Sequence, residues 1–123
     1  MRRKKRGFTL VEVMTVVIIV GILASVAVPL YRSNIRRAMA SEGAALLGSV
    51  RTAERIYYSE HGTYTADKSE LGVDTTGNKY FKDYTVELTA DGFIASTSGA
   101  EDTDAAGITV TIDQDGNLTY SGI

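Results

Sequence analysis

The pattern of hydrophobic and polar positions changes twice along this chain. Residues 8–31 are almost wholly apolar and carry a single charge, on Glu12. From Tyr31 to about residue 60, apolar residues recur every three or four positions, which predicts an amphipathic helix. Charged residues of this helix, Glu42 and Glu54 among them, are assigned mostly to its other, polar face. From Tyr84 onward, apolar and polar residues alternate, which predicts β-strands. The pattern therefore divides the chain into an apolar segment, an amphipathic helix and a sheet.

The apolar segment is long enough to cross a membrane. A helix over residues 8–31 would be about 36 Å long, and the hydrocarbon layer is about 30 Å thick. Residues 2–6 are all basic, which predicts that they stay in the cytoplasm while the rest lies on the far side. Removing these five from the 13 Lys and Arg leaves eight basic residues against 15 acidic ones. An acidic remainder argues against sequence-specific nucleic-acid binding.

Glu12 distinguishes between three interpretations of this segment. A secretory signal cut after residues 25–27 and a plain membrane anchor are both compatible with the composition. Neither gives a reason for Glu12, because a carboxylate in a membrane helix costs roughly 2.5–3.5 kcal/mol. If the chain is cut between Gly7 and Phe8, the new amino group of Phe8 lies one helical turn from Glu12 and can pair with it. Glu12 would then set the register between packed helices.

The stretch KKRGFTLVEVMTVVIIVGILASVAVP resembles the leader and first helix of type IV pilins and of the pseudopilins of type II secretion. The resemblance implies a leader over residues 1–7, cleavage by a prepilin peptidase between Gly7 and Phe8, and methylation of the Phe8 amine. It also implies that Phe8 and Glu12 act together in assembly. The implied partners are other copies of the chain, the peptidase, an inner-membrane assembly platform and membrane lipid.

The helical pattern continues past the apolar segment. Pro29 cannot donate a hydrogen bond to the residue 25 carbonyl, so we expect a kink or local unwinding there, with Gly21 as a second soft point. The family resemblance implies that the helix melts between Gly21 and Pro29 when subunits pack into a filament. The alternative is that Pro29 only bends an intact helix. One helix is predicted from about Phe8 to residue 60, with Gly62 as its C-cap. Residues 8–31 form its membrane and filament-core half, and 32–62 form the half that packs on a sheet.

Residues 63–123 are predicted to form a loop followed by a sheet. Asp67 and Glu70 suggest a capping box for one short helical turn. Two hairpins follow, the first turning at residues 91–92 and the second at residues 113–117, which gives an antiparallel sheet of about four strands. The fold class is therefore α+β, a long N-terminal helix packed on a small antiparallel sheet, as in the pilin fold. Six aromatic residues near the loop are interpreted as covering the core, with contact or charge transfer as the alternative: Tyr57, Tyr58, Tyr64, Tyr80, Phe81 and Tyr84.

Two clusters of side-chain oxygen atoms motivate the hypothesis of a calcium site, because calcium favours clustered carboxylates. They are Glu101, Asp102 and Asp104 in one loop, and Asp113, Asp115 and Asn117 in the second hairpin. Gly116 is misplaced for an EF-hand and no closing glutamate follows, so a solvated loop and a plain turn are favoured and no cofactor is predicted. With one histidine, no cysteine and no catalytic spacing, the chain is not expected to be an enzyme.

The resemblance thus implies a major type IV pilin, processed and polymerised into a cell-surface filament for adhesion, motility or DNA uptake. It would reside in the inner membrane before assembly and in an extracellular pilus afterwards. The alternative is a major pseudopilin that forms a periplasmic filament in type II secretion. An ordinary anchored or secreted domain is the third possibility.

Overall fold

The computed structural model describes residues 7–123, so the predicted leader lies outside the described residues except for Gly7. The described residues separate into an N-terminal unit, residues 7–34, and a C-terminal unit, residues 35–123. The elements are α1 (Leu10–His61), α2 (Lys68–Leu71), β1 (Thr85–Leu88), β2 (Phe93–Ser98), β3 (Thr109–Asp113) and β4 (Leu118–Ser121).

Helix α1 begins and ends at recognisable caps. The Thr9 carbonyl accepts the first helical hydrogen bond, from the Val13 N–H at 3.1 Å, so Thr9 is the N-cap residue. At the other end Gly62 adopts a φ of 76°, and its N–H donates to the Tyr58 carbonyl at 2.7 Å. A left-handed glycine closes many helices in this way. The predicted C-cap is therefore confirmed, but the helix starts at Leu10 and not at Phe8.

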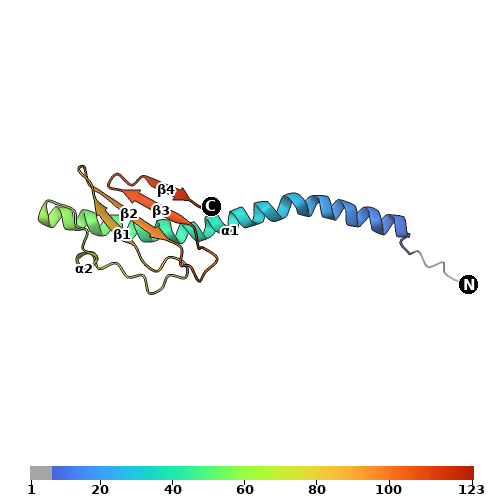
Figure 1. Ribbon diagram of the computed structural model, residues 1–123, viewed down its shortest axis with the longest axis horizontal. Coiled ribbons are helices and arrows are strands. Elements are labelled where there is room, and N and C mark those ends of the chain that lie inside the picture. The colour runs from blue at the N-terminus through green and yellow to red at the C-terminus, as the bar shows by residue number, and fades with distance from the viewer. Residues whose placement is uncertain (1–6) are drawn as a thin grey trace, which may run out of the picture. The chain divides into compact units, whose positions relative to one another are not determined.

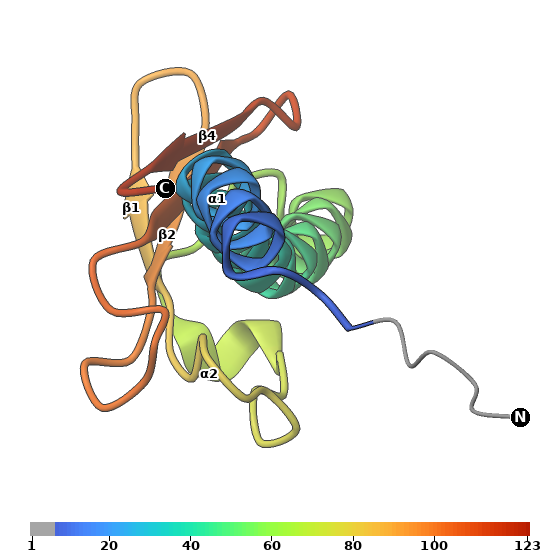
Figure 2. The ribbon, with the colours of Figure 1, turned by 90° about the vertical axis from the view of Figure 1, so that its right-hand side faces the viewer.

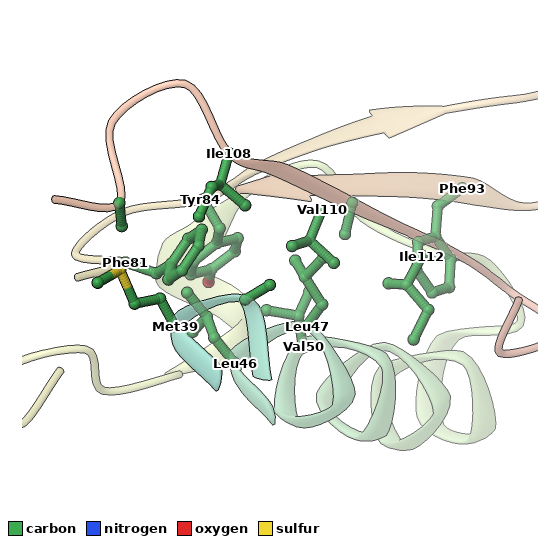
Figure 3. Packing of buried hydrophobic residues seen from close by; sticks show 13 residues of the cluster. Met39, Leu46, Leu47, Val50, Phe81, Tyr84, Phe93, Ile108, Val110 and Ile112 are labelled. Atoms are coloured by element: carbon green, nitrogen blue, oxygen red, sulfur yellow. The ribbon is translucent and has the colours of Figure 1, made fainter. Parts of the chain in front are cut away.

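The core of the C-terminal unit lies between α1 and one face of the sheet. The strands run along the green part of α1 in Figure 1. Figure 3 shows Phe81 and Tyr84 beside Met39 at one end of the core, and Phe93 with Ile112 at the other. The helix contributes Met39, Ala40, Gly43, Leu46, Leu47 and Val50 to the buried set. These residues recur every three or four positions, which is the predicted stripe.

Close packing of helix and sheet depends on Gly43. A Cβ atom at this position would lie 3.0 Å from Cε1 of Phe81 and 3.1 Å from Cγ2 of Val110. Both distances are shorter than ordinary van der Waals contacts, so the missing side chain allows Phe81 and Val110 to approach the helix backbone. The glycine therefore has a packing role, although it is disfavoured in helix interiors.

The sheet is an antiparallel meander with the order β1-β2-β3-β4. Val86 pairs with Ala95, Ala95 with Ile112, and Ile112 with Leu118, so these residues share the face toward α1. The predicted four-stranded sheet and its two hairpins are confirmed. β4 is exposed throughout, so the edge of the apolar face extends beyond the region that α1 covers.

Helix α2 is a single turn within the connection between α1 and the sheet. Asp67 is its N-cap: its carboxylate accepts hydrogen bonds from the N–H and the hydroxyl of Ser69, at 3.0 and 2.6 Å. Gly72 closes the turn with a φ of 65°. The Asp67 N–H donates to Thr65 and not to Glu70, so only half of the predicted capping box forms. Figure 2 shows α2 and β4 at opposite sides of the C-terminal unit.

Candidate assembly site

The region around Glu12 is organised by Thr9. The Thr9 hydroxyl accepts a hydrogen bond from the Glu12 N–H at 3.1 Å, which places Glu12 at the third position of the helix. Such a threonine and glutamate pair can form a reciprocal capping box. Among the described residues the Glu12 carboxylate makes no return bond to Thr9 and no ion pair. The helix start therefore uses the backbone of Glu12 and leaves its carboxylate available.

The predicted pairing of Phe8 with Glu12 concerns a chain cut after Gly7, whereas the structure describes the uncut chain. Phe8 lies before the N-cap and outside the helix, because the chain becomes helical only at Leu10. The positions of Phe8 and Glu12 are therefore not related as two residues of one helix face. Pairing of a Phe8 amine with Glu12 remains a prediction, and it requires either a local extension of the helix or a carboxylate from another copy.

The N-terminal unit exposes nearly all of its apolar surface. Every large apolar side chain in residues 8–31 is between 47% and 84% exposed. Among the described residues, α1 is the one helix that is long and apolar enough to cross a membrane. A single chain leaves this surface in contact with water, which is unfavourable in proportion to its area. Lipid or further copies of the segment would remove it from water.

Gly21 and Pro29 both lie inside a continuous helix. The helix assignment runs without a break from Leu10 to His61, and a Cβ atom added at Gly21 would meet nothing within 4 Å. The structure thus shows no local unwinding at either residue in the single chain. Melting of this stretch on filament packing remains a prediction.

Glu54 was predicted to lie on the polar face of the helix, and this prediction is wrong. Its side chain is fully buried, with one carboxylate oxygen accepting from the Thr65 N–H at 3.0 Å and the other without a partner. Burial raises the pKa of Glu54, and the Thr65 bond opposes this only in part. Glu54 follows Val50 by four positions and Leu47 by seven, and this spacing is the signal that the prediction overlooked.

Glu42, a second residue assigned to the polar face, joins α1 to the loop before the sheet. Its carboxylate accepts from the backbone N–H groups of Lys79, Tyr80 and Phe81, at 3.1, 2.7 and 2.9 Å. Although partial burial raises the pKa of Glu42, these three bonds outweigh that effect and lower it overall. Glu42 thereby fixes the segment that delivers Phe81 to the core.

Arg36 performs a similar task for the end of the sheet. Its guanidinium donates to the carbonyls of Asp104, Ala106 and Gly122, through four hydrogen bonds of 2.8–3.2 Å. All acceptors are neutral carbonyls, and they belong to two separate segments. Because the chain has no cysteine, Arg36 rather than a disulfide links these segments to α1.

The two predicted oxygen clusters have different structures. Asp113 accepts from the Asp115 N–H and from both the N–H and the amide of Asn117, so it organises the turn between β3 and β4. These bonds lower its pKa, with the Asn117 N–H as the main cause. Glu101, Asp102 and Asp104 are exposed in a loop. Among the described residues no three acidic or histidine side chains gather around a possible metal position.

The six aromatic residues divide between core and surface. Phe81 and Tyr84 are buried, which supports the core interpretation for these two. Tyr64 packs edge-on against Phe93, with ring centroids 4.9 Å apart, and Tyr58 lies over Tyr64 at 4.7 Å. These contacts continue from the core to the surface near the end of α1.

Two family models match the chain, and together they cover most of it. The prokaryotic N-terminal methylation motif matches residues 2–28, and the pilin family of bacterial filaments matches residues 36–122. Among solved structures, the chain is similar to the non-core minor pilin PilV of Neisseria meningitidis. That match has a TM-score of 0.59 and 30% identity, and it covers 74% of this chain and 91% of the other.

Curated relatives agree with the family models. The chain is 36% identical to the fimbrial protein EcpC of Eikenella corrodens, over 79% of this chain and 65% of that protein. It is 40% identical to the type IV major pilin protein PilE of Neisseria gonorrhoeae, over 71% of this chain and 54% of that protein. The chain thus spans about half to two thirds of the length of these relatives. By family models, relatives and fold, the chain belongs to the pilin family of bacterial filament proteins.

Proposed function

We propose that the chain is a major type IV pilin, processed between Gly7 and Phe8 and polymerised through its N-terminal unit. The observation that carries the proposal is the exposed apolar helix with one carboxylate close to its start, that of Glu12, which has no partner in the part of the chain that the structure describes. Membrane lipid would cover this surface before assembly, and neighbouring helices would cover it in the filament. The same surface thus serves the membrane form and the polymer.

In this proposal Glu12 selects the position of each incoming subunit. Cleavage frees the amine of Phe8, which a prepilin peptidase would also methylate. Inside an apolar bundle the positive amine and the negative carboxylate are both unfavourable unless they meet. A subunit out of register would bury two unpaired charges, so pairing would favour one axial step. An inner-membrane assembly platform would supply the subunits.

The proposal is tested by changing Glu12 alone. Glu12→Ala should leave cleavage after Gly7 intact but abolish filaments, because the Phe8 amine then has no partner. Mass spectrometry of the N-terminus and electron microscopy of sheared surface material measure the two outcomes. Val13→Ala is the matched control, since it shortens a neighbouring side chain without removing a charge. Normal filaments from Glu12→Ala would contradict the pairing role.

A minor-pilin role is the second candidate, because one solved structure that the chain resembles, PilV, is a minor pilin. Several relatives, PilE of Neisseria gonorrhoeae among them, are named type IV major pilin proteins, which favours the major role. Quantifying the chain in sheared filaments separates the two. A main component supports the major role, and a trace component supports the minor one.

The pseudopilin alternative predicts a different location and a metal dependence. A periplasmic filament would be absent from sheared surface material. Calcium would then raise the melting temperature of the C-terminal unit, and a chelator would lower it. We propose that this chain needs no calcium, since Asp113 is already engaged in its own turn. A strong chelator effect would favour the pseudopilin.

A further inference from the structure

A hollow of about 310 Å³ opens on the C-terminal unit where α1 ends and the β1–β2 hairpin turns. It is separate from the N-terminal unit and from the contacts of Arg36 and Glu42. Its walls come from the end of α1 and the following loop on one side and from the hairpin on the other. The residues that line it are Tyr58, Gly62, Thr63, Tyr64, Leu88, Thr89, Ala90, Asp91 and Gly92.

The aromatic wall of this hollow is held in place from behind. Tyr64 packs edge-on against the buried Phe93, and Tyr58 lies over Tyr64 at a tilt of 32°. Tyr58 nevertheless stays 48% exposed, and Leu88 on the other wall is 52% exposed. A fixed ring and an aliphatic side chain therefore face solvent at a site that is already formed.

The electrostatic features of the hollow all favour a cation. The carboxylate of Asp91 is exposed and makes no hydrogen bond or ion pair within residues 7–123. Helix α1 ends at His61, beside Gly62 in the lining, and the last turn of a helix carries negative partial charge. The faces of tyrosine rings attract cations as well. No Lys or Arg is among the lining residues.

We propose that this hollow binds a small alkylammonium ligand. The ammonium group would contact Asp91 and the ring of Tyr58, and its alkyl groups would contact Leu88. A ligand that also carries a phosphate would bind more weakly, because Asp91 repels the phosphate and no basic side chain lines the hollow to receive it. The ligand is therefore a free alkylammonium such as choline rather than the phosphocholine group of a lipid.

The test uses the full chain in maltoside micelles, with choline as the probe. Amide shifts of Gly62 and Gly92 report binding by NMR at pH 8. We expect saturable shifts with choline, and affinity about ten-fold weaker for 3,3-dimethylbutanol, its neutral isostere. Phosphocholine should also bind more weakly. Absence of saturable choline binding, or equal affinity for the isostere or for phosphocholine, would overturn the proposal.

Variants locate the site. Asp91→Asn should weaken choline binding about three- to ten-fold, since it removes the charge without changing the shape. Glu87→Gln is the matched control, because Glu87 is an exposed carboxylate on β1 that does not line the hollow. Tyr58→Leu should lose binding and Tyr58→Phe should keep it. If Glu87→Gln weakens choline binding as much as Asp91→Asn does, the attraction comes from general surface charge and the proposed site is refuted. Asp91 is exposed, so Asp91→Asn should fold and still test the site if Tyr58→Leu fails to fold.

Discussion

The N-terminal and C-terminal units differ in the exposure of their apolar side chains. In residues 8–31 every large apolar side chain is at least 47% exposed, whereas in residues 35–123 a cluster of 13 buried residues fills the space between α1 and the sheet. Polar contacts differ as well. Glu42 and Arg36 tie distant segments of the C-terminal unit together, while the carboxylate of Glu12 has no partner within residues 7–123. The comparison teaches that one unit is complete in a single chain and the other requires a lipid or protein environment.

The largest expected effect comes from placing a charge in the exposed apolar unit. Val17→Arg should reduce membrane retention by roughly 2.5–3.5 kcal/mol, because an arginine near the bilayer centre is costly. The unfolding free energy of the C-terminal unit should stay within about 0.5 kcal/mol. Membrane fractionation and denaturation by guanidinium measure these effects. Thr119→Arg, on the exposed strand β4, is the control and should change neither membrane retention nor the unfolding free energy. If both variants are retained equally, residues 8–31 do not lie in a membrane.

The next effect concerns Arg36. Arg36→Met keeps the aliphatic stem but removes four hydrogen bonds to three carbonyls, so we expect a loss of about 2 kcal/mol in stability. Denaturant unfolding of the C-terminal unit measures it. Arg37→Met is the matched control, since Arg37 is exposed and makes no side-chain hydrogen bond among the described residues. A similar loss in both variants would show that general helix effects dominate.

A smaller effect should appear in the pH dependence of stability. Burial raises the folded-state pKa of Glu54 above the ordinary value of about 4.3. Its stabilising contribution is therefore complete below that value and is lost as pH rises through the folded pKa. Relative to Glu54→Gln, the wild type should lose stability across that range. Thermal melts of both chains between pH 4 and pH 8 measure this, and a constant difference would mean that the pKa of Glu54 is not raised.

The smallest effects concern two glycines in the same helix. Gly48→Ala should stabilise the C-terminal unit by about 0.5–1 kcal/mol, because a Cβ atom there meets nothing within 4 Å. Gly43→Ala should destabilise it by about 1 kcal/mol, since contact with Phe81 and Val110 outweighs the helix preference. Denaturant midpoints of both variants give the comparison. Equal stabilisation would show that the sheet yields easily.

Most of the fold followed from local rules. Alternation predicted four strands and two hairpin turns, and β1–β2 and β3–β4 lie on either side of those turns; Asp67 predicted the start of α2. Gly62 predicted the end of α1 because a helix commonly closes with a glycine at positive φ. These strands, turns and caps depend on residues that are close together in the sequence, so they can be predicted from the sequence alone.

The remaining features depend on contacts between distant residues. Nothing near Arg36 in the sequence indicates that carbonyls 68 to 86 positions away will receive its guanidinium. Glu54 was assigned to the polar face because of its charge, although its spacing from Val50 fits the apolar stripe. Thr9 is a typical N-cap residue, so the start of α1 at Leu10 could have been predicted from the sequence. The helix was instead expected to begin at about Phe8, which lies outside it.

The simple order of strands in the C-terminal unit has a consequence for kinetics. Each strand pairs with the one that immediately precedes it, so the sheet closes only short loops and no strand must wait for a later one. Low sequence separation between partners favours rapid folding. A subunit emerging from a ribosome or a membrane channel can therefore complete its sheet in the order of synthesis, and this limits the time for which unpaired strand edges attract other chains.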